Sequence, residues 1–215
     1  MRRRGRNVAR SRMPPRVRAG AGKRLITPPV GGPLVGIPER DLANGSRGVH
    51  DQLYARALVL DNGLVAIALI SVDLFAVPYR LTAEIARNVN AKTGIPQDNV
   101  VLVASHTHSG PSVSKTFAGG EADGDWLAVL ISEVTNAVQD ACSSMRLARL
   151  GVCVDQSPIT LKFRSRLPTN GAHEPVQSEP QQSAVCTTEL ADPDLGVIRI
   201  SDLKGRNIAI VANFA

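Results

Sequence analysis

Two histidines separated by a single residue, His106 and His108, come directly after the apolar run 99–105. If that run is a β-strand, residues two apart share a face, so both imidazoles would project together where the strand ends. Gly110 and Pro111 then interrupt the regular pattern, which places the pair at the exit of the strand rather than inside a sheet. Binding sites in open α/β sheets lie at that edge.

Three kinds of chemistry fit this histidine pair. Imidazole suits zinc, and the spacing would aim both rings into one space, so His106 and His108 could be metal ligands. Two ordinary loop histidines held by hydrogen bonds fit the sequence about equally well. A catalytic acid/base pair without metal is compatible with the usual pKa of histidine and is the least favoured of the three.

Two acidic positions could assist such a site. Asp73 ends the apolar run 64–74 and could be the carboxylate that orients an imidazole from the second coordination shell. Taken alone, Asp73 fits a turn or helix-capping residue better. The adjacent pair His50 and Asp51 could likewise belong to a site, although its position before residues 53–56 favours an anchor for a strand entry.

The remaining polar candidates are weaker. Ser109 lacks the Gly-x-Ser-x-Gly setting of a hydrolase nucleophile. Arg164 and Arg166 lie in a polar segment and are either loop charges or, if they face the pocket, ligands for an anionic or carbonyl oxygen.

The elements that must position these residues can be predicted around 55–105. Runs 55–60 and 64–74 flank Asp61-Asn62-Gly63, which indicates a β-hairpin because Asn and Gly tolerate the positive φ of the turn. Run 64–74 is apolar on both faces, as in a central strand covered on both sides.

A helix should connect this strand to the run that carries the histidines. Leu81, Ile85 and Val89 recur every four residues, and Gly94 and Pro96 end the pattern. Residues 64–105 therefore predict a βαβ unit with parallel strands. If its strands are neighbours, Asp73 and His106 leave the sheet at the same edge.

The rest of the chain adds a helix over 126–141, capped by Asp125, and strands at 147–154 and 159–163. Segment 164–190 is polar and long, which suggests a functional loop or disorder. Runs 195–201 and 207–214 predict a second hairpin, and the Pro/Gly-rich stretch from Lys23 excludes a central strand there. The predicted fold class is α/β, with a mixed sheet that contains a βαβ unit and two β-hairpins, and helices packed on the sheet faces.

The length of 215 residues suits one domain with a tail, and the net charge of +6 has a local source. Residues 1–24 hold ten of the 25 Lys and Arg residues and none of the 19 acidic ones. We assign 1–22 to a basic, disordered tail and 23–215 to the domain. The tail lacks interleaved aromatic residues and an apolar face, which disfavours nucleic acid and leaves peripheral contact with a membrane surface open.

Neither a secretory signal nor a run near the roughly 20 apolar residues of a membrane-spanning helix is visible. The localisation therefore stays open, as does the oligomeric state.

Several motifs in order along the chain point to one family. Together they resemble the N-terminal catalytic domain of neutral/alkaline, non-lysosomal ceramidases, from about Gly22 to the last residue. The matching segments are Ile-Thr-Pro-Pro at 26–29, Gly-Val-His-Asp at 48–51 with 53–60, Ser-Val-Asp-Leu at 71–74, Ser-His-Thr-His-Ser-Gly-Pro at 105–111, Asp-Leu-Gly-Val at 194–197 and Asn-Phe-Ala at 213–215.

This resemblance implies a zinc-dependent amidohydrolase that cleaves the N-acyl bond of ceramide to sphingosine and a fatty acid, with zinc-bound water as the nucleophile. It implies that His106 is a zinc ligand and that His108 assists proton transfer or binds the reacting group. Arg166, or Arg164, would match the pocket arginine of the family, although Ser165 and Leu167 depart from the family pattern.

The resemblance also implies that the domain is incomplete. In the family a second histidine ligand follows shortly after Asn-Phe-Ala, and glutamate and tyrosine ligands come much later. We therefore expect a truncated domain that holds no catalytic zinc by itself. The alternatives are a catalytically inactive remnant, a hydrolase of another N-acyl or ester substrate, and an anion-binding module that uses the basic tail.

Overall fold

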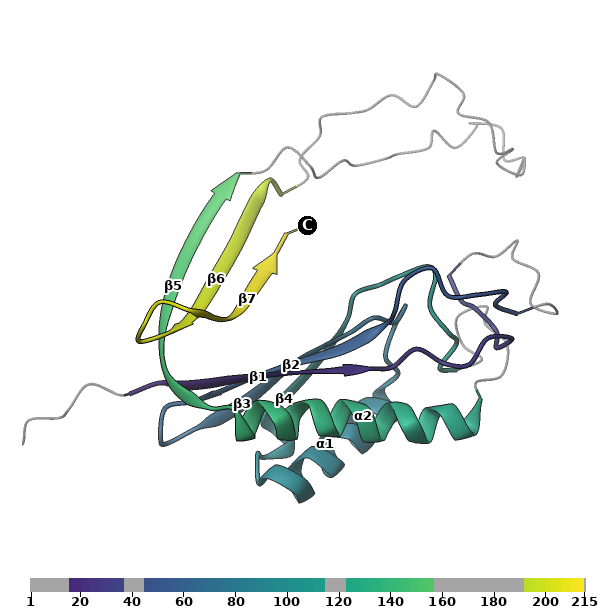
Figure 1. The fold of residues 1–215 in the computed structure, drawn as a ribbon, viewed down its shortest axis with the longest axis horizontal. Helices are drawn as coiled ribbons and strands as arrows, with labels where there is room; N and C mark the ends of the chain where they lie inside the picture. Colours follow the sequence, from purple (N-terminus) through teal and green to yellow (C-terminus); the bar gives the residue numbers. More distant parts are fainter. Residues whose placement is uncertain (1–15, 37–44, 115–122, 157–191, 215) are drawn as a thin grey trace, which may run out of the picture. The chain divides into compact units, whose positions relative to one another are not determined.

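The computed structural model describes residues 16–36, 45–114, 123–156 and 192–214 (Figure 1). The chain forms two compact units. Unit 1 comprises residues 1–149 with 200–209, and unit 2 comprises 150–199 with 210–215. The described strands follow the order β4-β3-β2-β1-β5-β6-β7 in one mixed, seven-stranded sheet.

The first predicted hairpin is confirmed. β2 (Tyr54–Asp61) and β3 (Ala66–Val72) pair antiparallel, with Leu58 opposite Leu69. Gly63 adopts a φ of +84° in the turn between them. The turn is closed by the side-chain oxygen of Asn62, which accepts hydrogen bonds from the backbone N–H groups of Leu64 and Val65 at 2.9 and 2.8 Å. Asn and Gly therefore form the turn for the reasons that their residue types suggest.

The predicted βαβ unit is also present. α1 (Tyr79–Thr93) and a short 3₁₀ turn, η1 (Gln97–Asn99), connect β3 to β4 (Val100–Ala104), which runs parallel to β3. Gly94 ends α1 in the left-handed conformation, with a φ of +76°, and its N–H bonds the carbonyl oxygen of Asn90. The three apolar positions predicted for the inner face of this helix are buried.

The core of unit 1 lies between the sheet and two helices. α1 and α2 (Gly124–Ser143) cover the same face of β1 to β4 (Figure 1). The prediction that run 64–74 is covered on both sides is wrong for the described residues, because on the other face β3 is only half-buried and Val101 and Val103 of β4 are 47% and 52% exposed. The largest core side chains include Val59, Ile70, Val72, Ile85, Val89, Leu130, Val134 and Val138.

β1 (Arg18–Leu25) corrects two expectations. It lies between β2 and β5, so the stretch from Lys23 does contribute to an internal strand, and residues 18–22 belong to this strand rather than to a tail. The sequence lacks an apolar alternation here because β1 packs against α2 through glycines. A Cβ on Gly20 or Gly22 would collide with backbone carbonyl oxygens of α2.

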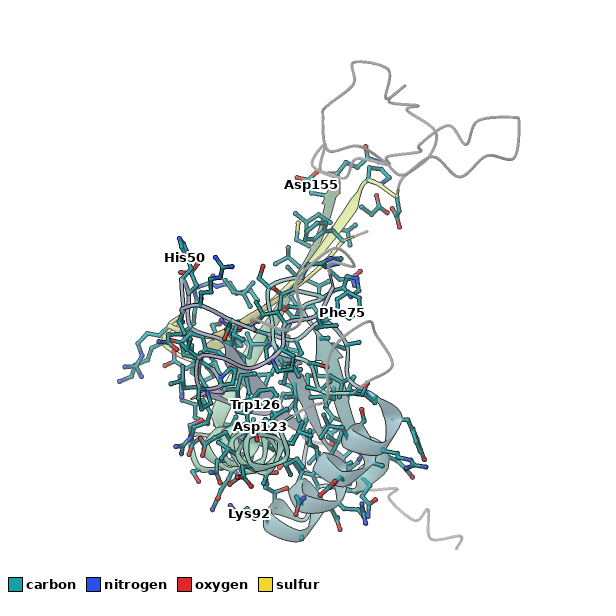
Figure 2. All side chains as sticks on the ribbon, turned by 90° about the vertical axis from the view of Figure 1, so that its right-hand side faces the viewer. His50, Phe75, Lys92, Asp123, Trp126 and Asp155 are labelled. Carbon is teal, nitrogen blue, oxygen red and sulfur yellow. The ribbon has the colours of Figure 1, made fainter. Side chains whose placement is uncertain are left out.

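The cap of α2 lies two residues before the predicted one. Asp123, not Asp125, precedes the helix, and its Oδ1 accepts hydrogen bonds from the backbone N–H groups of Asp125 and Trp126 at 2.9 and 3.2 Å. Figure 2 shows Asp123 and Trp126 together at this end of the helix. Gly124 occupies the first helical position, so the cap lies two residues earlier than the apolar pattern indicates.

The second predicted hairpin is confirmed by β6 (Asp194–Asp202) and β7 (Asn207–Asn213), and β5 (Arg146–Gln156) matches the predicted strand 147–154. Residues 1–15, the predicted strand 159–163 and the polar segment 164–190 lie outside the described residues. Among the described residues, no helix combines the length and apolar character needed to cross a membrane.

Candidate functional site

The two strands of the βαβ unit deliver their polar residues to one edge of the sheet, as predicted. The parallel ladder continues beyond the strand ends, since Ser105 N–H donates to the Val72 carbonyl oxygen at 2.9 Å and Thr107 N–H to that of Leu74 at 3.2 Å. The loop that carries the histidines therefore follows the end of β3 residue by residue. Its position is fixed by backbone hydrogen bonds, independently of its side chains.

His106 has a backbone conformation that is uncommon for residues other than glycine. Its φ is +60°, the only positive value outside glycine among the described residues. This left-handed conformation costs on the order of 1–3 kcal/mol and is retained where surrounding contacts determine it. The strand has already ended at Ala104, so the alternation that led us to group the two histidines does not apply at His106.

One hydrogen bond defines the chemistry of the His106 ring. Its Nδ1 lies 2.8 Å from the carbonyl oxygen of Phe75. A carbonyl oxygen only accepts, so Nδ1 must donate and carry the hydrogen. In the neutral ring the lone pair then lies on Nε2. An Nδ1–H bonded to a backbone carbonyl is the usual outer-shell arrangement of a histidine that binds metal through Nε2.

Three aromatic rings meet at this point. Phe75 stacks on His106, with ring centroids 4.4 Å apart and an interplanar angle of 30°. His108 lies edge-on to both of them, 5.0 Å from Phe75 and 5.1 Å from His106. The prediction that the two imidazoles project together is thus correct. Both histidines are exposed in the described structure.

The Pro/Gly-rich segment before β2 pairs with the loop that carries His106 and His108, which we call the histidine loop (residues 105–112). Val35 N–H donates to the Gly110 carbonyl oxygen at 3.1 Å, and Ser112 N–H donates to that of Pro33 at 3.0 Å. Next to this bridge, Gly36 has a φ of +101°. The Pro/Gly-rich segment, to which the sequence analysis assigned no functional role, is therefore part of the site.

Gly36 and Phe75 are the site residues that sequence reasoning missed. A carbonyl acceptor has no signature in the sequence, because every residue carries one. Gly36 could have been suspected only as one of several glycines in a segment rich in Gly and Pro.

The predicted role of Asp73 is not supported by its contacts. Its Oδ2 accepts hydrogen bonds from the backbone N–H of Tyr54 at 2.9 Å and from the guanidinium of Arg56 at 2.8 Å. These bonds tie the end of β3 to the start of β2. Among the described residues, the group that orients His106 is the Phe75 carbonyl.

His50 and Asp51 contact each other, with His50 Nδ1 2.7 Å from Asp51 Oδ2. Their side chains are 98% and 88% exposed, so they do not anchor the strand entry by packing. Figure 2 shows His50 projecting outward, away from Phe75. Arg164 and Arg166 lie outside the described residues.

A pocket of about 390 Å³ opens beside the histidine loop. Thr107 and Ser109, which alternate with the two histidines, form one part of its wall. Its volume lies within the range of small-molecule sites. Other lining residues come from the Pro/Gly-rich segment and from the loop before β2, among them Pro28, Leu34, Val49, His50 and Leu53.

Comparison with known proteins decides the family. The model of the family "Neutral/alkaline non-lysosomal ceramidase, N-terminal" matches residues 18–215, which include nearly all of the chain. This chain belongs to that ceramidase family. The match begins at the first residue of β1, in agreement with the structure and not with the expected boundary at residue 22.

Individual ceramidases resemble parts of this chain. The neutral ceramidase of Drosophila melanogaster is 33% identical over 100 residues, which are 44% of this chain and 14% of that protein. The crystal structure of neutral ceramidase from Pseudomonas aeruginosa superposes with a TM-score of 0.75 at 20% identity, over 94% of this chain and 32% of that one. A ceramidase complexed with C2 gives a TM-score of 0.71 at 19% identity, over 93% and 31% of the two chains.

The match covers only part of each of these relatives. The chain spans about a third of the solved ceramidases and a seventh of the fly protein, and the structural likeness shows a shared fold.

The residues present fit one part of a zinc site. His106 offers a prepared Nε2 lone pair, and imidazole is a preferred zinc donor. No group of three or more His, Cys, Asp or Glu side chains that could hold a metal occurs within residues 16–36, 45–114, 123–156 and 192–214.

Proposed function

We propose that this chain forms part of a zinc-dependent amidohydrolase that cleaves the N-acyl bond of ceramide. Membership of the ceramidase family supports the substrate class. The observation that carries the proposal is the hydrogen bond from His106 Nδ1 to the Phe75 carbonyl oxygen, which leaves Nε2 available to bind a metal. In the overall reaction water adds to the amide carbon, the C–N bond breaks, and sphingosine and a fatty acid are released.

Three of the predicted site residues have a role in this proposal. His106 would hold the zinc, which when bound would activate water and polarise the amide carbonyl. His108, whose ring centroid lies 5.1 Å from that of His106, would transfer a proton to the leaving nitrogen or bind the reacting group. Arg166 would bind the carbonyl oxygen of the substrate. The pocket beside Thr107 and Ser109 would accept the part of the substrate next to the amide.

The test uses the complete gene product that contains these residues. We expect about one zinc per molecule by elemental analysis, and release of fatty acid from a short-chain ceramide in detergent micelles. His106→Ala should abolish both. His108→Ala should retain zinc and lower kcat about 10²–10⁴-fold, the usual contribution of a general acid or base. His50→Ala is the histidine control for zinc content alone, since the His50 side chain is 98% exposed and contacts Asp51, while its position in the pocket lining excludes it as a control for activity.

Two outcomes would overturn the proposal. A gene product that holds no zinc and hydrolyses no amide would support the inactive scaffold. Zinc-dependent cleavage of other N-acyl or ester compounds at rates well above that of ceramide would retain the metal and replace the substrate.

A further inference from the structure

The ring of Phe75 lies close to three residues: His106, His108 and Gly36. It contacts both imidazoles, at centroid distances of 4.4 and 5.0 Å. Gly36 lies against Phe75 and His108 together, since a Cβ there would stand 3.1 Å from Phe75 Cδ2 and 3.0 Å from both Cα and Cγ of His108. A Cβ at Gly36 would therefore require Phe75 or His108 to shift by a few tenths of an ångström.

Gly36 is itself held in place. The adjoining residues 33–35 pair with 110–112 through two backbone hydrogen bonds and an isolated bridge between Leu34 and Pro111. Gly36 also has a φ of +101°, which side chains rarely adopt. The backbone that lies against His108 is therefore held by hydrogen bonds to residues 110–112.

Phe75 acts on His106 through two separate groups. Its carbonyl oxygen selects the Nδ1–H tautomer, and its ring limits rotation of the imidazole by stacking on it. A carbonyl alone would permit the His106 ring to swing about its bonds and exchange this partner for water. The ring contact confines that motion.

We propose that Phe75 and Gly36 are positioning residues that prepare His106 for metal binding and hold His108 beside it. The inference rests on the proposed zinc-binding role of His106. It assigns to an apolar side chain and a glycine the orienting function that a carboxylate often performs in metal sites.

The first experiment needs neither metal nor activity. Long-range ¹H–¹⁵N correlation spectra of the metal-free chain, labelled at histidine and measured where the rings are neutral, report the tautomer of each imidazole. We expect His106 to be the Nδ1–H tautomer. Phe75→Leu, which keeps the carbonyl and an apolar side chain but removes the ring, should give His106 a mixture of tautomers. Phe75→Tyr should restore the single form.

The second experiment measures zinc affinity in the complete gene product by competition with a fluorescent chelator. Phe75→Leu and Gly36→Ala should weaken zinc binding about 10–100-fold, as loss of outer-shell partners does. Gly31→Ala is the matched control, because Gly31 has a similar φ of +108° but open space around it. It imposes the same backbone strain without crowding the histidines.

The outcomes separate this inference from the proposed function. An unchanged His106 tautomer and unchanged zinc affinity in Phe75→Leu would overturn the positioning role, whether or not the enzyme is active. An equal loss of affinity in Gly31→Ala and Gly36→Ala would overturn the role of Gly36. If the wild-type gene product holds no zinc, the zinc function fails, while the tautomer spectra still decide whether Phe75 orients His106.

Discussion

Asp73 accepts a hydrogen bond from the backbone N–H of Tyr54 at 2.9 Å, which links the end of β3 to the start of β2. The same oxygen accepts from Arg56 at 2.8 Å. The residue that precedes the histidine-orienting carbonyl by two positions is thus engaged in closing the sheet edge on which the site stands.

We expect Asp73→Ala to lower the free energy of unfolding by about 1–3 kcal/mol, because it leaves the half-buried Tyr54 N–H without a partner. Asp73→Asn keeps an acceptor oxygen and should cost less. Urea denaturation measures both values. Arg56→Ala is the control, with an expected loss below about 1 kcal/mol since that side chain is 48% exposed. Equal losses in Asp73→Ala and Arg56→Ala would contradict the importance of the Tyr54 bond.

Trp126 connects α2 to the segment that leads to Gly36. Its indole Nε1–H donates to the carbonyl oxygen of Ile26 at 3.1 Å, and both side chains are almost fully buried. Trp126→Phe should destabilise the chain by about 2–3 kcal/mol, from the unpaired carbonyl and the smaller ring. Thermal unfolding followed by circular dichroism checks this. Tyr79→Phe, at an 85% exposed aromatic residue, should leave the midpoint unchanged.

Gly22 sets how closely α2 approaches the sheet. A Cβ there would collide with the carbonyl oxygen of Ala137, a backbone atom that cannot rotate away. Gly22→Ala should therefore cost about 1–3 kcal/mol or prevent folding. Urea denaturation can follow the fluorescence of Trp126, the single tryptophan. Gly48→Ala, with open space around it, should change stability by less than about 0.5 kcal/mol. A Gly22→Ala variant as stable as wild type would show that α2 can shift.

Asp202 should make stability depend on pH. Burial raises the pKa of its carboxyl, but hydrogen bonds from the side chain and backbone of Arg206 and from the Lys204 N–H outweigh this, so the pKa lies below its ordinary value of 3.8. A lowered folded-state pKa contributes stability that is present above the ordinary value and is lost as the pH falls through the folded value.

We expect Asp202→Asn to be less stable than wild type at neutral pH and to lose less stability below about pH 4. Urea midpoints measured from pH 7 to pH 3 give this comparison. Lys204→Ala retains the backbone donor and should follow the wild-type profile. Parallel profiles for wild type and Asp202→Asn would contradict the role of Asp202.

The parts of the fold that the sequence predicted are those whose determinants are local. Asn62 and Gly63 form a turn, and the four-residue apolar spacing on α1 together with Gly94 defines a helix and its end. Because parallel strands joined by a helix align their ends, the edge that carries His106 followed from these elements.

The missed features depend on contacts between distant segments. β1 has no apolar alternation because its glycines accommodate α2, and the sequence does not reveal which helix will pack there. The sequence analysis named Asp125 as the cap and not Asp123, because Gly124 was not expected to be helical. The tautomer of His106 depends on a backbone carbonyl of residue 75, which no residue type announces.

The contact between His106 and Phe75 also bears on the order in which the chain folds. Phe75 and His106 are 31 residues apart, and their contact joins the ends of β3 and β4, which pair in parallel across α1. Pairings of this range pay their loop-closure entropy before they gain stability, so they form slowly relative to local structure. We therefore expect the NMR signal of the His106 Nδ1–H tautomer to appear late in refolding, together with the pairing of β3 and β4.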